Sequence, residues 1–156
     1  GLRSILQNNF EPAMVLTSAL AEHARDEGLE GCSAVNVSSI HARFAELGNG
    51  PYAASKGALE AATVTVAAEF ARYGIRVNCV RPGAIDTPMN RSLSQDDIDR
   101  ISERVPMARF GSPIEVANII EFLVSSKASY VTGATFTVDG GRGACDPHVG
   151  GVGGVA

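Results

Sequence analysis

The chain has 156 residues, with 13 Lys and Arg against 17 Asp and Glu, and 45% of its residues are hydrophobic. This composition predicts one globular domain with a single core, and it argues against disorder, collagen-like repeats and a membrane protein. Because the net charge is −4, we expect neither nucleic acid nor an anionic membrane to be a partner.

The C-terminal end differs from the rest in composition. Seven of the 17 glycines lie within residues 140–156, and glycine-rich segments behave as flexible coils. We therefore expect a domain over residues 1–141, followed by a Gly-rich flexible tail over residues 142–156.

The three cysteines, Cys32, Cys79 and Cys145, follow the spacing of no disulfide framework. This pattern is typical of a reducing compartment, so we predict a cytoplasmic protein. Cys145 and His148 are three residues apart, but no second pair of ligands accompanies them, and we predict no metal site. The N-terminal residues lack the uninterrupted apolar core of a signal peptide. The chain begins without Met inside a predicted helix, and we expect a preceding segment to be missing.

Helices and strands alternate along the chain. The helices are predicted from apolar residues at three-to-four spacing, capping residues and alanine content, and the strands from short apolar, β-branched runs. In chain order, the predicted elements are a helix over 2–25, a strand over 33–39, a helix over 52–73, a strand over 75–81, a short helix over 94–104, a helix over 113–125 and a strand over 135–139. This alternation predicts an α/β protein with a parallel sheet and right-handed crossovers.

About three strands with flanking helices are few for a sheet of this kind. Parallel sheets are normally buried on both faces, and a three-stranded sheet leaves two open edges. The sequence therefore indicates half of a domain.

Tyr52 and Lys56 are the first candidates for chemistry. They are four residues apart at the start of a long predicted helix, so both side chains lie on one face. An ammonium there favours the phenolate form that a general acid/base needs. Ser39 ends the preceding strand, at the edge where open parallel sheets bind ligands. Taken alone, such a pair is more often a surface tyrosine beside a solvated lysine, and its context favours a site.

Five segments supply that context across residues 2–141. They are Asn36–Ser39, Tyr52–Ala58, Gly74–Gly83, Thr87–Met89, and the stretch from Tyr130–Gly133 to Asp139–Gly141. In order and spacing they resemble the classical short-chain dehydrogenases/reductases. The resemblance implies the C-terminal half of a Rossmann-type doubly wound parallel sheet, whose fifth to seventh strands this chain supplies and whose N-terminal strands are absent.

The same resemblance assigns catalytic roles. It implies that Tyr52 is the acid/base and also meets the nicotinamide end of the cofactor. Lys56 assists it and contacts the nicotinamide ribose, and Ser39 binds the substrate oxygen. Asn9 fits the fourth catalytic position better than its neighbour Asn8, and would hold a water that links Lys56 to solvent. The alternative for Asn9 is a helix-face amide without a catalytic role.

The segment after the second predicted strand is the candidate cofactor segment. The resemblance implies that Pro82 to Thr87 wraps the nicotinamide, with Ile85 meeting the carboxamide through its backbone and Thr87 through its hydroxyl. Gly83 allows close backbone approach to a ligand. A plain Pro-Gly turn is the alternative. His41 and Arg43 follow Ser39 and could face substrate, although we expect a solvated loop for both.

Part of the family's machinery is not found in this sequence. No Gly-rich phosphate-binding turn stands between a strand and a helix, and the strand whose residue distinguishes NAD from NADP has no counterpart. The cofactor is therefore NAD or NADP, without a readable preference.

Two functions from different classes follow. The first is the catalytic half of an NAD(P)-dependent oxidoreductase acting on a small carbonyl/alcohol substrate, similar to a 3-oxoacyl-acyl-carrier-protein reductase or a sugar dehydrogenase, and homo-oligomeric as its family usually is. We expect this half to be inactive alone. The alternative is a truncated, non-catalytic α/β domain that acts through self-association or partner pairing at its open sheet edge.

Overall fold

A parallel sheet of three strands forms the centre of the protein. The computed structural model describes residues 1–44, 46–90 and 92–144. In these residues the strands are β1 (Ser33–Val37), β2 (Arg76–Pro82) and β3 (Thr135–Val138), in the spatial order β1-β2-β3. Val35 pairs with Asn78, and Val80 pairs with Phe136. The predicted α/β class and parallel sheet are confirmed.

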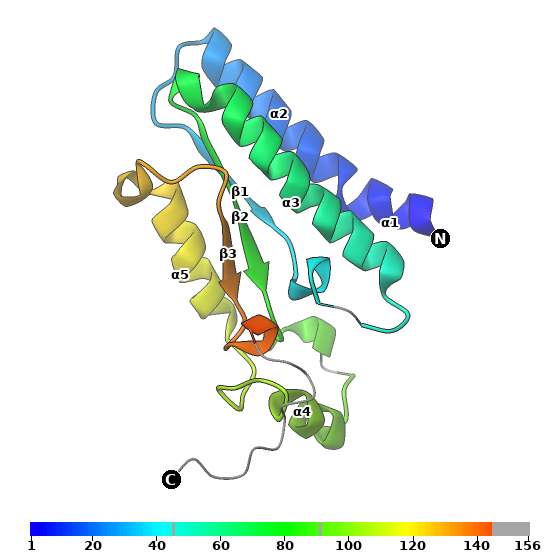
Figure 1. Ribbon diagram of the computed structural model, residues 1–156. Coiled ribbons are helices and arrows are strands. Elements are labelled where there is room, and N and C mark those ends of the chain that lie inside the picture. The colour runs from blue at the N-terminus through cyan, green and yellow to red at the C-terminus, as the bar shows by residue number, and fades with distance from the viewer. Residues whose placement is uncertain (45, 91, 145–156) are drawn as a thin grey trace.

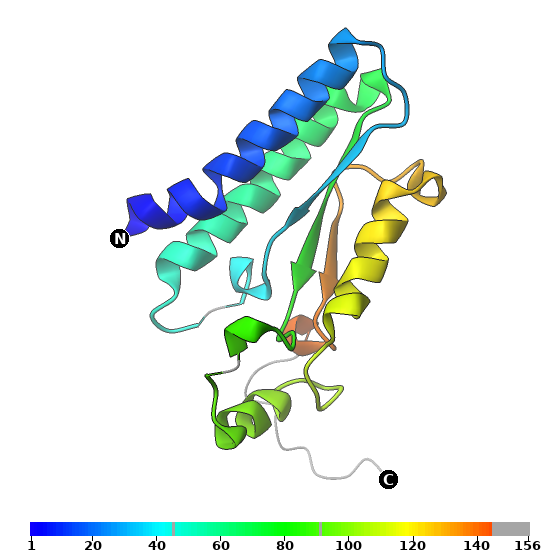
Figure 2. The same cartoon turned by 180° about the vertical axis from the view of Figure 1, so that it is seen from behind.

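Helices cover both faces of this sheet (Figures 1 and 2). One face carries α1 (Leu2–Asn9), α2 (Glu11–Asp26) and α3 (Gly50–Phe70), and the other carries α5 (Pro113–Val124). The short helix α4 (Gln95–Ser102) lies beyond the carboxyl ends of the strands. In the described part of the chain, no helix is both long and apolar enough to cross a membrane.

The first predicted helix is wrong as a single element. It is interrupted at Phe10, so that α1 and α2 replace one helix over 2–25. The cause is Pro12, which stands in the first turn of α2. Proline lacks a backbone N–H and its ring clashes with the carbonyl four residues earlier, so a helix through Asn8 and Asn9 cannot continue across it.

The remaining elements were predicted to within a few residues. β1 ends at Val37, two residues before the predicted end, and α3 begins at Gly50, two residues before the predicted start. A 3₁₀ turn follows α3 and ends at Gly74, whose φ of 73° is the left-handed conformation that glycine tolerates. Ser112 is the N-cap of α5, as predicted, and its N–H donates to the Glu115 carboxylate at 2.7 Å.

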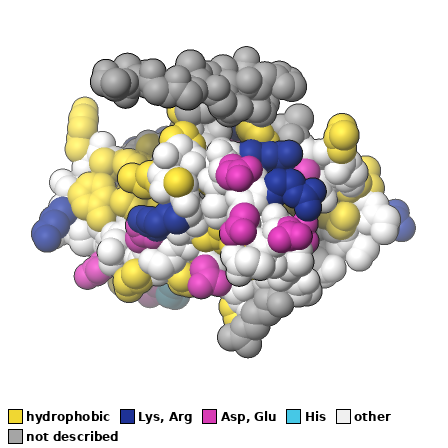
Figure 3. Space-filling model, turned by 90° about the horizontal axis from the view of Figure 1, so that it is seen from below, with side chains coloured by type: hydrophobic (Ala, Val, Ile, Leu, Met, Phe, Trp, Pro, Cys, Tyr) yellow, Lys and Arg dark blue, Asp and Glu magenta, His cyan; other side chains and the backbone are white. Residues whose placement is uncertain are grey.

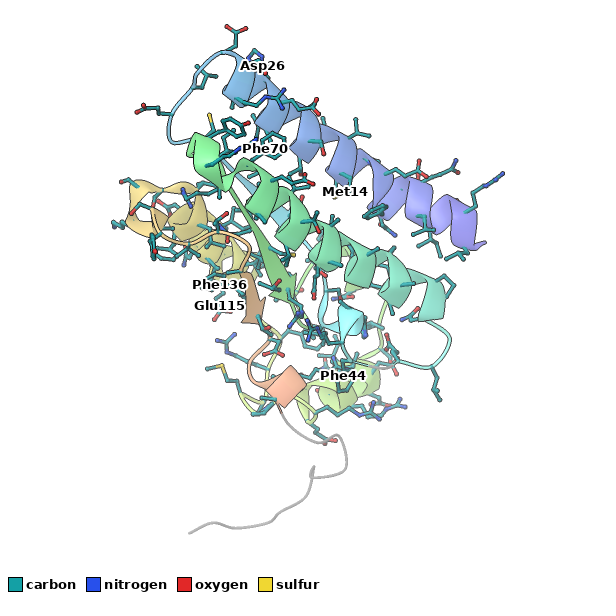
Figure 4. The ribbon with its side chains drawn as sticks, turned by 45° about the horizontal axis from the view of Figure 1, so that its top comes forward. Met14, Asp26, Phe44, Phe70, Glu115 and Phe136 are labelled. Atoms are coloured by element: carbon teal, nitrogen blue, oxygen red, sulfur yellow. The ribbon has the colours of Figure 1, made fainter. Side chains whose placement is uncertain are left out.

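Side chains of β2 alternate between two apolar clusters. Val77 packs in the cluster between the sheet and α2 and α3, together with Phe70 and Met14 (Figure 4). Val80 points to the other face and packs with Leu123 of α5. Because successive side chains of a strand point to opposite faces, one strand stabilises both layers.

Two buried polar groups fix helices to strands. The Asn36 side chain accepts a hydrogen bond from Thr17 of α2 at 3.1 Å and donates to Thr63 of α3 at 3.0 Å. Arg76 donates from its guanidinium to the Leu123 and Ser125 carbonyls at the end of α5, at 2.7 and 3.1 Å. The Arg76 bonds satisfy carbonyls that the end of α5 leaves without partners. Together the two groups hold the helices of both faces to the sheet.

The described structure ends in a single 3₁₀ turn, Arg142–Ala144. Arg142 is buried, and its guanidinium lies 5.4 Å from the centre of the Phe44 ring. Figure 4 shows Phe44 beside this turn, below the carboxyl ends of the strands. Structure therefore extends into the first three residues of the predicted tail. The rest of that tail, with Cys145 and His148, lies outside the described residues.

Candidate active site

Ser39 lies just beyond the carboxyl end of β1. The ladder continues past the strand, because the Ser38 N–H donates to the Val80 carbonyl at 2.8 Å. Ser39 then caps a 3₁₀ turn over Ile40–Ala42, and its hydroxyl accepts from the His41 N–H at 3.3 Å. Ser39 is buried, so its hydroxyl is held in one place at this edge of the sheet.

Tyr52 and Lys56 stand on the first two turns of α3, as predicted. Lys56 Nζ lies 5.8 Å from the centre of the Tyr52 ring and donates to the Val37 carbonyl at 2.9 Å. This bond ties α3 to the end of β1, and so brings Lys56 to the strand end that leads into Ser39. Burial lowers the pKa of the Lys56 ammonium below its ordinary value.

His41 contacts both Ser39, through its backbone N–H, and Tyr52, through its ring. The expectation that His41 stands in a solvated loop is therefore wrong. Its side chain is only 18% exposed, and its ring meets that of Tyr52 edge-on, with the ring centres 6.2 Å apart. Nε2 lies 3.1 Å from the Glu46 carboxylate. Arg43, by contrast, is 75% exposed as expected. The sequence feature that could have indicated His41 as a site residue is its position two residues after Ser39.

Asn9 is the last residue of α1 and is half-buried. α1 packs along α3, the helix that carries Tyr52 and Lys56 (Figure 1). Among the hydrogen bonds of the described residues, none uses the Asn9 side chain. Its role in holding a water near Lys56 therefore stays a prediction.

Long-range backbone bonds fix the segment from Pro82 to Thr87. Ile85 forms a parallel bridge with Gly111, and its carbonyl accepts from the Asn90 side chain at 2.7 Å. Among the described residues, no hydrogen bond uses the Ile85 N–H or the Thr87 hydroxyl. A donor thus remains available on each of the two residues predicted to meet the nicotinamide. Sequence reasoning missed Asn90, which holds the Ile85 carbonyl.

Gly83 owes its identity to a contact within the protein. A Cβ on Gly83 would lie 2.6 Å from Asp139 Cβ and 2.8 Å from Asp139 Cα. Pro82 ends β2, and the Gly83 N–H donates to the Val138 carbonyl at 2.9 Å. The described structure therefore explains this glycine by close packing against the residue after β3, without calling on a ligand.

This contact predicts the effect of a single methyl group. Gly83→Ala is expected to lower the free energy of unfolding by about 1–3 kcal/mol, because the backbone of Asp139 cannot yield as a flexible side chain would. Gly50→Ala is the matched control, since a Cβ there meets nothing within 4 Å. Urea unfolding of both variants checks the prediction. Equal urea midpoints for Gly83→Ala and Gly50→Ala would contradict the prediction.

A hollow of about 490 Å³ adjoins the same segment. Its lining comes from the loop after Ile85, from α4, and from the turn before α5, and includes Asp86, Leu93, Ile98 and Phe110. Seen from the carboxyl ends of the strands (Figure 3), the acidic and basic side chains of the described residues are intermingled. The region offers a mixed polar and apolar surface.

Comparisons with known proteins show the family to which the chain belongs. Residues 1–142 match the family described as Enoyl-(Acyl carrier protein) reductase, and the chain belongs to the short-chain dehydrogenases/reductases. It is 38% identical over 137 residues to the human (3R)-3-hydroxyacyl-CoA dehydrogenase, covering 88% of this chain and 52% of that protein.

Two further relatives extend the comparison. The chain is 46% identical over 109 residues to the 3-oxoacyl-[acyl-carrier-protein] reductase FabG of Thermotoga maritima, covering 70% of this chain and 44% of that protein. Its fold matches a gluconate 5-dehydrogenase from Burkholderia cenocepacia, solved with NADP and tartrate, with a TM-score of 0.86 and 31% identity over 93% of this chain and 57% of the other. The chain thus spans about half the length of these relatives.

Proposed function

We propose that this chain supplies the catalytic half of an NAD(P)-dependent oxidoreductase that acts on a carbonyl/alcohol pair. The observation that carries the proposal is the gathering of Ser39, Tyr52 and Lys56 at the carboxyl end of β1. There Lys56 is hydrogen-bonded to the strand and lies 5.8 Å from the centre of the Tyr52 ring. Open parallel sheets bind ligands beyond the carboxyl ends of their strands.

The chemistry of the chain's own residues is proton transfer and orientation. Tyr52 donates its hydroxyl proton to the carbonyl oxygen during reduction, and accepts the alcohol proton in the reverse direction. The positive charge of Lys56 stabilises the phenolate that remains. The Ser39 hydroxyl orients the substrate oxygen by a hydrogen bond. We assign Asn9 the role of holding a water near Lys56.

The nicotinamide end of a dinucleotide fits the residues present. The Ile85 N–H and the Thr87 hydroxyl, which no hydrogen bond among the described residues uses, are suitable partners for a carboxamide, and Lys56 for a ribose hydroxyl. When bound, the nicotinamide supplies or accepts the hydride. NAD and NADP both remain candidates, because the sequence contains no Gly-rich phosphate-binding turn before a helix and no ribose-reading strand.

The substrate class we propose is a 3-oxoacyl thioester or a sugar-derived alcohol. The named activities of the human, Thermotoga and Burkholderia relatives support this choice. The hollow beside Asp86 supports it too, because its lining is both polar and apolar. We also propose a cytoplasmic location and a homo-oligomer formed through α2 and α3, since α2 exposes Val15, Leu16 and Leu20.

The test uses this chain joined to the amino-terminal half of the Thermotoga relative, which by the family resemblance carries the Gly-rich turn. This protein is called the joined enzyme below. We expect it to oxidise NADH or NADPH when a 3-oxoacyl thioester or a keto sugar acid is added, as followed by nucleotide absorbance. A folded joined enzyme that binds nucleotide but turns over neither substrate would contradict the proposed substrate class.

A second candidate is a non-catalytic pairing domain. The observation that favours it is the position of β1, which is an edge strand of the sheet and pairs with β2 alone among the described strands. Its last residue, Val37, is 43% exposed. Such an edge presents backbone groups to another chain.

A further inference from the structure

A buried carboxylate, Glu60, stands beneath the candidate site. Glu60 lies on α3 one turn after Lys56 and is only 6% exposed. Arg81 approaches it with two donors, Nε at 2.7 Å from Oε1 and Nη2 at 2.5 Å from Oε2. This is the paired geometry in which a guanidinium binds a carboxylate most strongly. It connects α3 to the end of β2.

The same carboxylate also holds the end of β1. The Ser38 hydroxyl donates to Glu60 Oε1 at 2.8 Å, and the Ser38 N–H donates to the Val80 carbonyl at 2.8 Å. Ser38 is thus fixed through both its side chain and its backbone. Because Ser39 is the next residue, its position follows from that of Ser38.

The charges around Glu60 keep it ionised. Burial alone would raise its pKa, but the hydrogen bonds from Arg81 and Ser38 outweigh burial, and the pKa lies below its ordinary value. Arg43 adds a positive charge, with Nε 3.7 Å from Oε2. Arg81 also donates to the Thr137 hydroxyl at 3.1 Å, which extends the cluster to β3.

We propose that Glu60 is a positioning residue for the active site, acting on Ser39 through Ser38 and on the Pro82–Gly83 segment through Arg81. Its carboxylate joins the three elements that carry the acid/base pair, the substrate-binding hydroxyl and the cofactor segment. An apolar side chain at this place could pack between the layers, but it could accept no bond from Ser38 or Arg81. The catalytic meaning of the inference rests on the proposed function, whereas its geometry does not.

The first experiment measures geometry in the 156-residue chain itself. Amide hydrogen exchange is followed in Glu60→Gln and in Glu69→Gln, an exposed glutamate on the same helix that serves as control. We expect the Ser38 amide of Glu60→Gln to exchange about tenfold faster relative to the Cys79 amide of β2, because local opening exposes single amides whereas global unfolding exposes all of them. An unchanged ratio in Glu60→Gln would overturn the proposal.

The second experiment measures catalysis in the joined enzyme. We expect Glu60→Gln to lower kcat, corrected for the folded fraction, by about 10–100-fold, the size of effect that follows from a small misplacement of reacting groups. In the control variant Glu69→Gln, both kcat and the cofactor dissociation constant should stay unchanged. A lower melting temperature with normal kcat would reduce Glu60 to a structural role and overturn the proposal.

Two further outcomes distinguish failure of the proposed function from failure of the proposal for Glu60. If the wild-type joined enzyme folds but binds no nucleotide, the proposed function fails, and the exchange ratio alone decides the role of Glu60. If Glu60→Gln does not fold, Arg81→Lys replaces it, since this variant keeps the charge and loses the paired geometry. It is expected to change the Ser38 ratio in the same direction, and an unchanged ratio would again overturn the proposal.

Discussion

Tyr52→Phe is expected to lower the kcat of the joined enzyme by about 10²–10⁴-fold, the usual loss when a positioned acid/base is removed. The variant keeps the ring that packs edge-on against His41 and deletes only the hydroxyl. The fold should therefore be unaffected. Steady-state rates with a saturating substrate, together with circular dichroism, check both parts of this expectation.

Tyr73→Phe is the matched control for that variant. Tyr73 lies in the 3₁₀ turn after the far end of α3, and its hydroxyl accepts a hydrogen bond from the neighbouring Arg72 at 2.7 Å. Its kcat should equal that of the unsubstituted joined enzyme. A Tyr52→Phe enzyme with near-normal kcat would remove Tyr52 from the proposed acid/base role.

The 156-residue chain alone is expected to bind NADH and NADPH too weakly to measure, and to have no dehydrogenase activity. A dinucleotide is anchored mainly at its pyrophosphate, by a Gly-rich turn at a helix N-terminus, and at its ribose. This sequence contains neither element, although Tyr52, Lys56, Ile85 and Thr87 can meet the nicotinamide end. Calorimetric titration of the purified chain with NADH and with NADPH measures both affinities.

The joined enzyme is the positive control for this titration, because it restores a Gly-rich turn. Low-micromolar affinity in the chain alone would contradict the expectation, and light scattering on the same samples would show whether a second copy completes the site. We expect self-association of the chain in any case, since α2 exposes Val15 and Leu16 and β1 pairs with β2 alone among the described strands. A joined enzyme that binds no nucleotide would favour the non-catalytic pairing domain.

Local sequence signals were sufficient for most of the secondary structure and for one pair of site residues. The spacing of Tyr52 and Lys56 predicts that they share a helix face, because four residues are about one helical turn. Gly74 and Ser112 mark the ends of their helices through conformations and bonds that involve only near neighbours. The same kind of signal, Pro12, predicts the interruption at Phe10, and the strong apolar periodicity across it concealed the break.

The tertiary structure decided what depends on contacts between distant segments. The burial of His41 against Tyr52, the packing of Gly83 on Asp139, and the bonds that Glu60 accepts from Ser38 and Arg81 all join residues of different elements. A single sequence records periodicity and capping, which are local, but contains no measure of which side chains meet across layers. The sequence by itself therefore determined most of the helices, the strands and the Tyr52–Lys56 pair, and only the packing of α3 on the sheet decided which side chains surround that pair.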